Sequence, residues 1–289
     1  MKKFIYIFIL LSISLTACQK ERGLKSVSSI QIKGSDTIVN LVQVWAEEFV
    51  KNKPTINIGV TGGGSGTGFA ALINDTCDIA MSSRKIEDKE VAEAQKNNIF
   101  IEEFIIGLDG LIILVNKDNP INELTLEQLR DIFMKKVYNW KELGGKDMEI
   151  VILSRESNSG THMFFKEKVL RQGDPKAKDE FAIEALLMPS SQAIFDEVSQ
   201  NPHAVGYVGM GFSNKEVKVL KIARDNKSDY ISPTPENISN SDYPISRPLL
   251  LYTKKNPVQL VKDFIDFALS QEGQKIVLET DFVPIKKDF

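Results

Sequence analysis

The sequence predicts an α/β fold with mainly parallel sheets. Short apolar segments with the composition of strands alternate with segments whose apolar residues recur at the helical period. Two of the strand segments, residues 111–115 (LIILV) and 149–153 (EIVIL), are nearly continuous apolar runs, as expected for strands that are buried on both faces. Small polar turns follow several strands, and in α/β sheets ligands bind at such carboxyl ends of strands.

The first predicted strand, residues 30–33 (IQIK), ends at a polar turn over residues 34–37 (GSDT). A helix follows, with Ser35 or Asp36 as its natural N-cap. Its apolar residues lie on one face, because they recur at the helical period; they are Ile38, Leu41, Val42, Trp45 and Phe49. Residues 56–60 (INIGV) form the next predicted strand.

A glycine-rich turn at 62–68 then opens a second helix, which places Phe69, Leu72 and Ile73 inward. Residues 77–81 (CDIAM) are expected to form a third strand that ends at Ser82-Ser83-Arg84. The remaining predicted elements are strands at 203–210 and 247–255 and a C-terminal helix over roughly 259–271.

The N-terminal residues predict export. A basic start precedes an apolar run of about twelve residues, which is too short to span a bilayer comfortably. Residues 1–17 are therefore expected to be a signal peptide. The following Leu-Thr-Ala-Cys resembles the bacterial lipobox, which predicts lipidation of Cys18 and a tether over residues 18–28. A short membrane anchor and an ordinary cleavage site are the alternatives.

Composition argues against several classes of function. Apolar residues make up 42% and charged residues 26% of the 289, which is enough for a sizeable core. The net charge of −3 gives no indication of nucleic-acid binding. Two histidines and two cysteines without a close cluster argue against a zinc site, and no cofactor is expected. Cys77 is expected in the core, so a lipidated chain forms no intramolecular disulfide.

Two turns about 95 residues apart resemble each other, namely 62–69 (GGGSGTGF) and 155–165 (RESNSGTHMFF). Each contains Ser-Gly-Thr after a strand, and each precedes a helical segment. Helix N-termini carry free N–H groups and partial positive charge, so two such turns can hold one small oxyanion from opposite sides, with Arg155 as its countercharge. The alternative is that both are only helix caps. The first turn fails the P-loop, dinucleotide and nucleophile-elbow patterns, since it lacks lysine and has Thr67 where glycine is required.

Further stretches make a family resemblance visible. They are residues 78–84 (DIAMSSR), 129–143 (LRDIFMKKVYNWKEL), 155–165 and 204–209 (AVGYVG). With them, nearly all of the mature chain resembles the phosphate-binding proteins of bacterial phosphate ABC importers, which are type II periplasmic binding proteins. The resemblance implies an α/β fold of two lobes, each a mainly parallel sheet flanked by helices, with the ligand cleft between them. Lobe 1 is expected at 29–110 plus 247–289, and lobe 2 at 111–246.

The resemblance also implies a set of phosphate-binding residues. In lobe 1 they are Ser35, Thr37 and Ser65, together with Ser83 and Arg84 at the end of the third strand; in lobe 2 they are Arg155, Ser159, Gly160 and Thr161. Some relatives carry an aspartate at the position of Ser83, and it accepts the proton of hydrogen phosphate. We therefore hypothesise that Asp36 accepts that proton here, the alternative being a helix cap. Glu156 is expected to orient Arg155.

The function implied is binding of inorganic phosphate outside the cytoplasm and its delivery to ABC permease subunits that work with a cytoplasmic ATPase. The protein is expected to be a monomer, lipid-anchored on the outer face of the cytoplasmic membrane, with no nucleic-acid partner and no enzymatic activity. The same fold could instead bind sulfate or molybdate, or serve as a sensor or adhesive lipoprotein. A hydrolase that uses Ser159 or Ser65 with His162 or His203 is the alternative of a different class.

Overall fold

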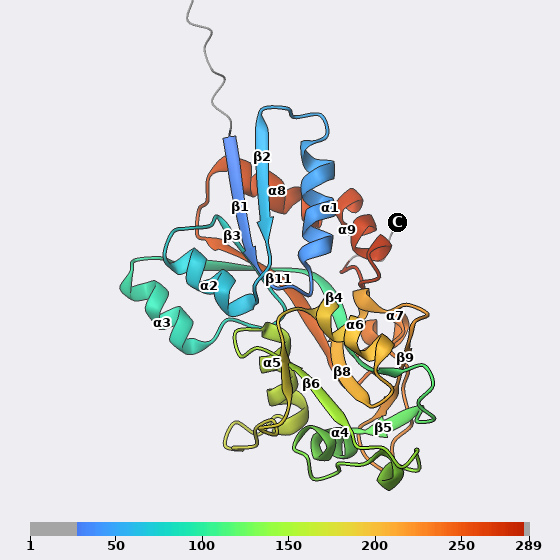
Figure 1. The fold of residues 1–289 in the computed structure, drawn as a ribbon. Helices are drawn as coiled ribbons and strands as arrows, with labels where there is room; N and C mark the ends of the chain where they lie inside the picture. Colours follow the sequence, from blue (N-terminus) through green and yellow to red (C-terminus); the bar gives the residue numbers. More distant parts are fainter. Residues whose placement is uncertain (1–27, 286–289) are drawn as a thin grey trace, which may run out of the picture.

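The computed structural model describes residues 28–285, which form two lobes joined by a pair of strands (Figure 1). The predicted signal peptide and Cys18 lie outside the described residues, as does nearly all of the predicted tether. The α/β fold class is confirmed.

The upper lobe in Figure 1 contains three parallel strands in the order β2-β1-β3. These strands are β1 (Ser28–Gly34), β2 (Ile56–Thr61) and β3 (Ile79–Ser82). The helices of this lobe are α1 (Val39–Val50), α2 (Ser65–Ile73), α3 (Asp88–Lys96), α8 (Gln259–Leu269) and α9 (Gln271–Glu279). The last two helices come from the end of the chain, which returns to the upper lobe after the lower lobe is complete.

The lower lobe contains the parallel strands β8-β6-β7 and a separate parallel pair of β5 and β10. Its strands are β5 (Glu123–Thr125), β6 (Val151–Arg155), β7 (Leu186–Met188), β8 (Ala204–Gly209), β9 (Val217–Val219) and β10 (Lys221–Ala223). Its α-helices are α4 (Leu126–Phe133), α5 (Gly160–Phe165), α6 (Ser191–Gln200) and α7 (Pro235–Ser239). Shorter helical turns lie at Trp140–Leu143, Lys166–Leu170 and Met210–Phe212.

Two strands, β4 (Ile101–Asn116) and β11 (Ser246–Lys254), connect the lobes. The first part of β4 pairs antiparallel with β11, and its last part pairs antiparallel with β8. The parallel strands β2-β1-β3 of the upper lobe and β8-β6-β7 of the lower lobe therefore belong to one continuous sheet, whose antiparallel pairs all involve β4 or β11. The lobe boundaries predicted near residues 110 and 247 fall within β4 and β11 and stay a prediction.

One prediction about a helix cap is wrong, and one helix was missed. Helix α1 begins at Val39 with Ile38 at the N-cap position and no side-chain cap, so neither Ser35 nor Asp36 caps it. The Ser35 hydroxyl instead accepts the N–H of Thr37 within the turn. The helix predicted over roughly 259–271 is α8, but it does not end the helical part of the chain: Ser270 ends α8, and its hydroxyl accepts the N–H of Gly273 at the start of a further helix, α9, which was not predicted.

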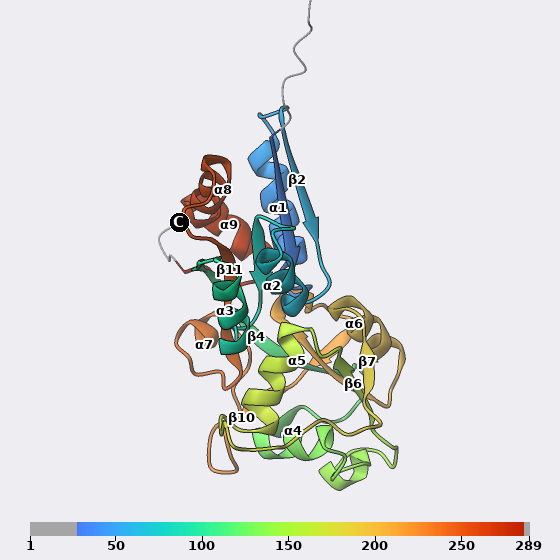
Figure 2. The ribbon, with the colours of Figure 1, turned by 90° about the vertical axis from the view of Figure 1, so that its left-hand side faces the viewer.

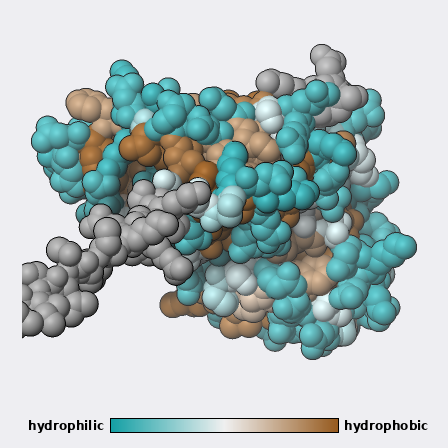
Figure 3. Space-filling model, turned by 90° about the horizontal axis from the view of Figure 1, so that it is seen from above, coloured by the Kyte–Doolittle hydropathy of each residue, from teal (hydrophilic) through white to brown (hydrophobic). Residues whose placement is uncertain are grey.

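The core agrees with the predicted helical face. Leu41, Val42, Trp45 and Phe49 of α1 are buried, and the Trp45 indole donates to the carbonyl of Gly273 in α9 at 2.8 Å. Cys77 is buried as expected. Seen from above, the surface is mainly hydrophilic with smaller hydrophobic areas (Figure 3). Among the described helices, none combines the length and apolar character that a membrane span requires.

Candidate functional site

The polar turns predicted from the sequence meet where the two lobes face each other. The turns after β1 and β3 and the start of α2 come from the upper lobe, and the start of α5 comes from the lower lobe; α2 and α5 approach each other in Figure 2. Six hydroxyl side chains in these turns are at most 2% exposed, namely Ser35, Thr37, Ser65, Ser83, Ser159 and Thr161. They gather because parallel strands direct their carboxyl ends to the same edge of a sheet.

The hydroxyl groups form a network across the boundary between the lobes. Ser35 Oγ donates to Ser83 Oγ at 3.0 Å, and Ser65 Oγ accepts the N–H of Ser83 at 3.1 Å. Thr161 Oγ1 of the lower lobe lies 2.8 Å from Thr37 Oγ1 and 3.5 Å from Ser83 Oγ of the upper lobe. A hydroxyl can reorient to donate, so these groups can turn together toward one anion.

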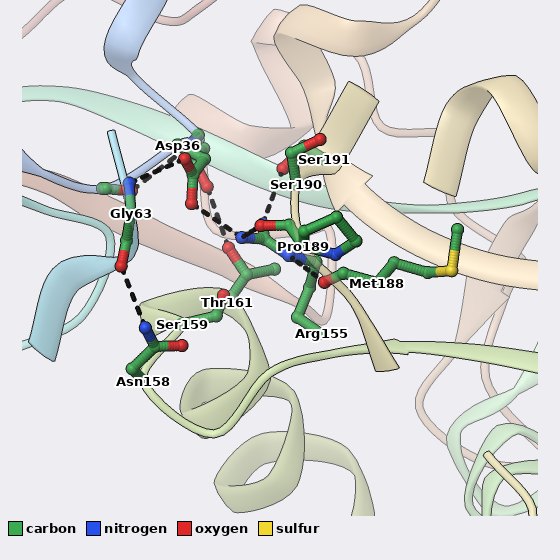
Figure 4. Close-up of polar contacts among 12 residues, drawn as sticks. Asp36, Gly63, Arg155, Asn158, Ser159, Thr161, Met188, Pro189, Ser190 and Ser191 are labelled. Carbon is green, nitrogen blue, oxygen red and sulfur yellow. Dashed lines mark hydrogen bonds and ion pairs between the residues drawn. The ribbon is translucent and has the colours of Figure 1, made fainter. Parts of the chain in front are cut away.

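Arg155, at the end of β6, links the two lobes through Asp36 (Figure 4). Its Nη2 donates to Asp36 Oδ2 at 2.7 Å, while Asp36 Oδ1 accepts the N–H of Gly63 at 2.9 Å. Glu156, which was expected to orient Arg155, is exposed. The guanidinium is held instead by the carbonyls of Met188 and Pro189, at 3.2 and 3.0 Å, and by the Ser191 hydroxyl at 3.1 Å.

The start of α5 touches the upper lobe closely. Ser159 caps the helix, its Oγ accepting the N–H of His162 at 3.4 Å. A Cβ on Gly160 would lie 2.2 Å from Ser65 Oγ and 2.8 Å from Ser83 Oγ, so glycine is required for this approach. Asn158, which sequence reasoning missed, adds two contacts: its carbonyl accepts the N–H of Gly66, and its side-chain amide donates to the Gly63 carbonyl.

Arg84 is the predicted site residue that the structure does not bring into this network. Its Nη1 and Nη2 both donate to the Glu90 carboxylate at 2.7 Å, and Nη1 also donates to the Lys85 carbonyl. The guanidinium lies over the Phe69 ring, 4.8 Å from its centroid. These contacts turn the terminal nitrogens toward α3.

A second buried arginine was missed altogether. Arg247 in β11 pairs with Asp109 in β4, with Nη2 and Oδ2 2.7 Å apart, and its Nη2 also donates to Thr161 Oγ1 at 3.2 Å. Burial raises the pKa of the Asp109 carboxyl, and the Arg247 guanidinium opposes that rise. The available signal was a charged residue with apolar neighbours in each of two strands, since such charges are rarely buried without a partner.

The hydrolase alternative gains no support from the histidines. His162 Nδ1 lies 3.3 Å from Ser154 Oγ rather than against Ser159 or Ser65, and burial lowers the pKa of His162 to about 4. His203 is exposed, with Nδ1 3.0 Å from the carbonyl of Glu149. Within residues 28–285, no group of three His, Cys, Asp or Glu side chains is arranged to hold a metal ion.

Comparison with known proteins identifies the family. Residues 20–272 match the family model of the PBP superfamily domain. The phosphate-binding protein PstS of Pseudomonas aeruginosa is 32% identical, over 94% of this chain and 87% of that protein. PstS of Borreliella burgdorferi is 31% identical, over 99% of this chain and 100% of that protein.

Solved structures agree. A putative phosphate ABC transporter substrate-binding protein with bound phosphate from Clostridium perfringens is similar at a TM-score of 0.80 and 33% identity, covering 90% of this chain and 100% of that one. An ABC-type phosphate transport receptor from Vibrio cholerae has a TM-score of 0.69 and 32% identity, covering 88% and 99%. The chain therefore belongs to the PBP superfamily, in the family of the phosphate-binding proteins PstS.

Proposed function

We propose that this protein binds inorganic phosphate between its lobes and delivers it to the permease of an ABC importer. The observation that carries the proposal is the convergence of buried hydroxyls from both lobes beside Arg155, because donors around a fixed guanidinium suit a tetrahedral oxyanion. The names of its relatives, phosphate-binding proteins and a phosphate transport receptor, support the same ligand.

The proposed ligand residues are Ser35, Thr37, Ser65, Ser83, Arg155, Ser159, Gly160 and Thr161. Arg84 supports the upper lobe in this proposal, since its ion pair with Glu90 directs both terminal nitrogens toward α3 and, among the described residues, it makes no hydrogen bond to the hydroxyl network. Residues 29–110 plus 247–289 and residues 111–246 act as the two closing units, with β4 and β11 as the hinge. Hinge closure on the ligand would bring the donors of both lobes onto one anion.

Asp36 would accept the proton of bound hydrogen phosphate. Each of its carboxylate oxygens already accepts one bond, from Gly63 or Arg155, and each retains lone-pair capacity for a ligand O–H. A fully ionised sulfate has no proton to donate, so its oxygens would meet the carboxylate as like charges. This arrangement would give the site its preference for phosphate.

Calorimetry on protein stripped of bound anion tests the ligand. We expect tight binding of phosphate and weak binding of sulfate at neutral pH, because only hydrogen phosphate matches both the donors and the Asp36 acceptor. Equal or stronger binding of sulfate, or no binding of phosphate, would contradict the proposed function.

The protein would work outside the cytoplasm as a monomer, attached to the membrane through lipid on Cys18. The lipobox-like Leu-Thr-Ala-Cys at the end of the apolar leader supports this attachment. Labelling of cells with a radioactive fatty acid should mark the wild type and not the Cys18→Ser variant. A Cys18→Ser protein that is processed and still firmly bound to membranes would argue against the lipid anchor.

A further inference from the structure

The Asp109–Arg247 pair lies at the centre of the connection between the lobes. The two residues are directly opposite each other in the antiparallel strands β4 and β11. Asp109 Oδ2 accepts from Arg247 Nε at 2.8 Å, and Asp109 Oδ1 accepts the N–H of Met210 at 2.9 Å. The side chains of Arg247 and Asp109 are 1% and 0% exposed. The carboxylate therefore fixes one edge of the guanidinium in a buried site.

The rest of the guanidinium faces the predicted binding residues. Nη1 donates to the Ser83 carbonyl at 3.1 Å, and Nη2 lies 3.2 Å from Thr161 Oγ1 and 3.5 Å from Thr37 Oγ1. Thr37 belongs to the upper lobe and Thr161 to the lower lobe. Arg247 thus touches the hydroxyl network from the hinge side, with contacts to both lobes at once.

A purely structural role accounts poorly for these contacts. A buried ion pair between two apolar strands adds little stability, and hydrophobic residues of similar volume often replace such a pair without loss. Asp109 also binds only part of the Arg247 guanidinium. The remaining N–H groups donate to the Ser83 carbonyl and the Thr161 hydroxyl of the binding network. A planar fork of donors held rigidly at one edge is suited to tetrahedral oxyanions.

The charges around the network lead to the same conclusion. Asp36 and Asp109 carry two negative charges, which Arg155 and Arg247 balance. Without Arg247 these groups would have a net negative charge, and a phosphate dianion would be repelled in a site where solvent screens little. Because the two carboxylates and the two guanidinium groups are neutral together, the hydroxyls and the Arg247 guanidinium can attract the incoming anion.

We propose that Arg247 is a second anion-binding arginine, held by Asp109, which donates to the ligand when the Thr37 and Thr161 hydroxyls turn toward it. The proposal rests on the proposed function. It makes the hinge strands part of the binding site, so that the ligand contacts both lobes and the connection between them.

Two variants test this role. The double variant Asp109→Asn/Arg247→Gln removes both charges together and leaves no buried charge unpaired. Arg247→Lys retains the charge but loses the fork. Arg130→Gln is the matched control, because Arg130 forms an ion pair with Asp179 in the lower lobe, outside the hydroxyl network. Phosphate affinity is measured by calorimetry, and thermal unfolding is followed with and without phosphate.

We expect the double variant to bind phosphate about 10- to 150-fold more weakly, the loss of one charge-assisted hydrogen bond. Its melting temperature without phosphate should stay near that of the wild type, while the increase caused by phosphate is largely lost. Arg247→Lys should bind at least about fivefold more weakly, because an ammonium lacks the planar fork. Arg130→Gln should bind like the wild type.

The outcomes separate this inference from the proposed function. A wild type that fails to bind phosphate would overturn the proposed function itself. A wild type that binds, with a folded double variant of equal affinity, would overturn only the role of Arg247. Should the double variant not fold, Arg247→Lys decides, since wild-type affinity in that variant excludes a forked contact to the anion.

Discussion

Two carboxylate–arginine pairs border the candidate site, and they differ in which parts of the chain they join. In both, the carboxylate accepts a guanidinium at 2.7 Å and also accepts one backbone N–H. The Asp36–Arg155 pair joins a turn of the upper lobe to a strand of the lower lobe (Figure 4). The Asp109–Arg247 pair joins β4 and β11, the two adjacent strands that connect the lobes. Separation of the lobes would break the first pair and preserve the second.

This difference assigns distinct tasks to the two arginines. If the lobes close on the ligand as proposed, the Arg155–Asp36 contact would form only on closure, because it joins residues of the two lobes. The Arg247–Asp109 contact would persist in an open state, because it joins paired strands of the connection, so the Arg247 charge would be in place before the ligand arrives. The side-chain exposures agree with this division: Asp36 is 14% exposed, whereas Asp109 is completely buried.

The most damaging change to the Asp36–Arg155 pair should be Arg155→Ala. The variant loses a guanidinium fixed beside the ligand hydroxyls and leaves Asp36 facing the anion without its partner. A charge-assisted hydrogen bond contributes roughly 1.5–3 kcal/mol, so the loss of one such bond together with the unpaired charge of Asp36 predicts phosphate binding at least about 100-fold weaker. Calorimetry measures the change. Arg171→Ala, in the lower lobe beside Glu180, is the control and should bind normally. Near-native affinity in Arg155→Ala would remove Arg155 from the site.

The same comparison explains what the sequence could and could not predict. Asp36 and Arg155 lie in or beside polar turns after strands, where ligand-binding residues are expected, and both were predicted as site residues. Asp109 and Arg247 lie inside largely apolar strands, so their positions gave no sign of a binding site. Opposite charges in two separate strands identify a buried pair only when the strand register is known, and that register depends on the tertiary fold.

Local sequence rules also failed where tertiary contacts use the same side chain. Asp36 suits an N-cap, but its carboxylate binds Gly63 and Arg155 instead, so α1 begins without a side-chain cap. Arg84 follows a strand like the other site residues, yet Glu90 on the next helix binds it. In both cases the role of the side chain depends on a partner that lies far along the sequence or on another element.

Gly160→Ala should weaken closure without removing any ligand group. The added methyl would collide with the Ser65 and Ser83 side chains of the opposite lobe, so relief requires the lobes to separate. Overpacking costs about 1–3 kcal/mol, which predicts phosphate affinity about 5- to 150-fold weaker. Small-angle scattering should show less compaction on adding phosphate than in the wild type. Ser157→Ala, an exposed change in the same turn, is the control. Normal compaction of Gly160→Ala would mean that the lobes close around phosphate with more space than this structure has.

The smallest expected effect concerns the preference for phosphate over sulfate, which we attribute to Asp36 as the acceptor of the ligand proton. Asp36→Asn keeps the size of the side chain but replaces one acceptor oxygen by an amide that donates. We expect the ratio of phosphate affinity to sulfate affinity to fall, because the ligand proton loses its acceptor and the like-charge repulsion of sulfate disappears. A change of about 1.4 kcal/mol in the difference between the two anions corresponds to about tenfold in their affinity ratio. Calorimetry with both anions at one pH measures that ratio. Since the amide side chain of this variant would also lose the ionic contact to Arg155, both affinities can fall together for that reason alone. Only the ratio of the two affinities therefore tests whether Asp36 accepts the ligand proton. A ratio equal to that of the wild type would mean that Asp36 only holds the lobes together and that other groups discriminate between the anions.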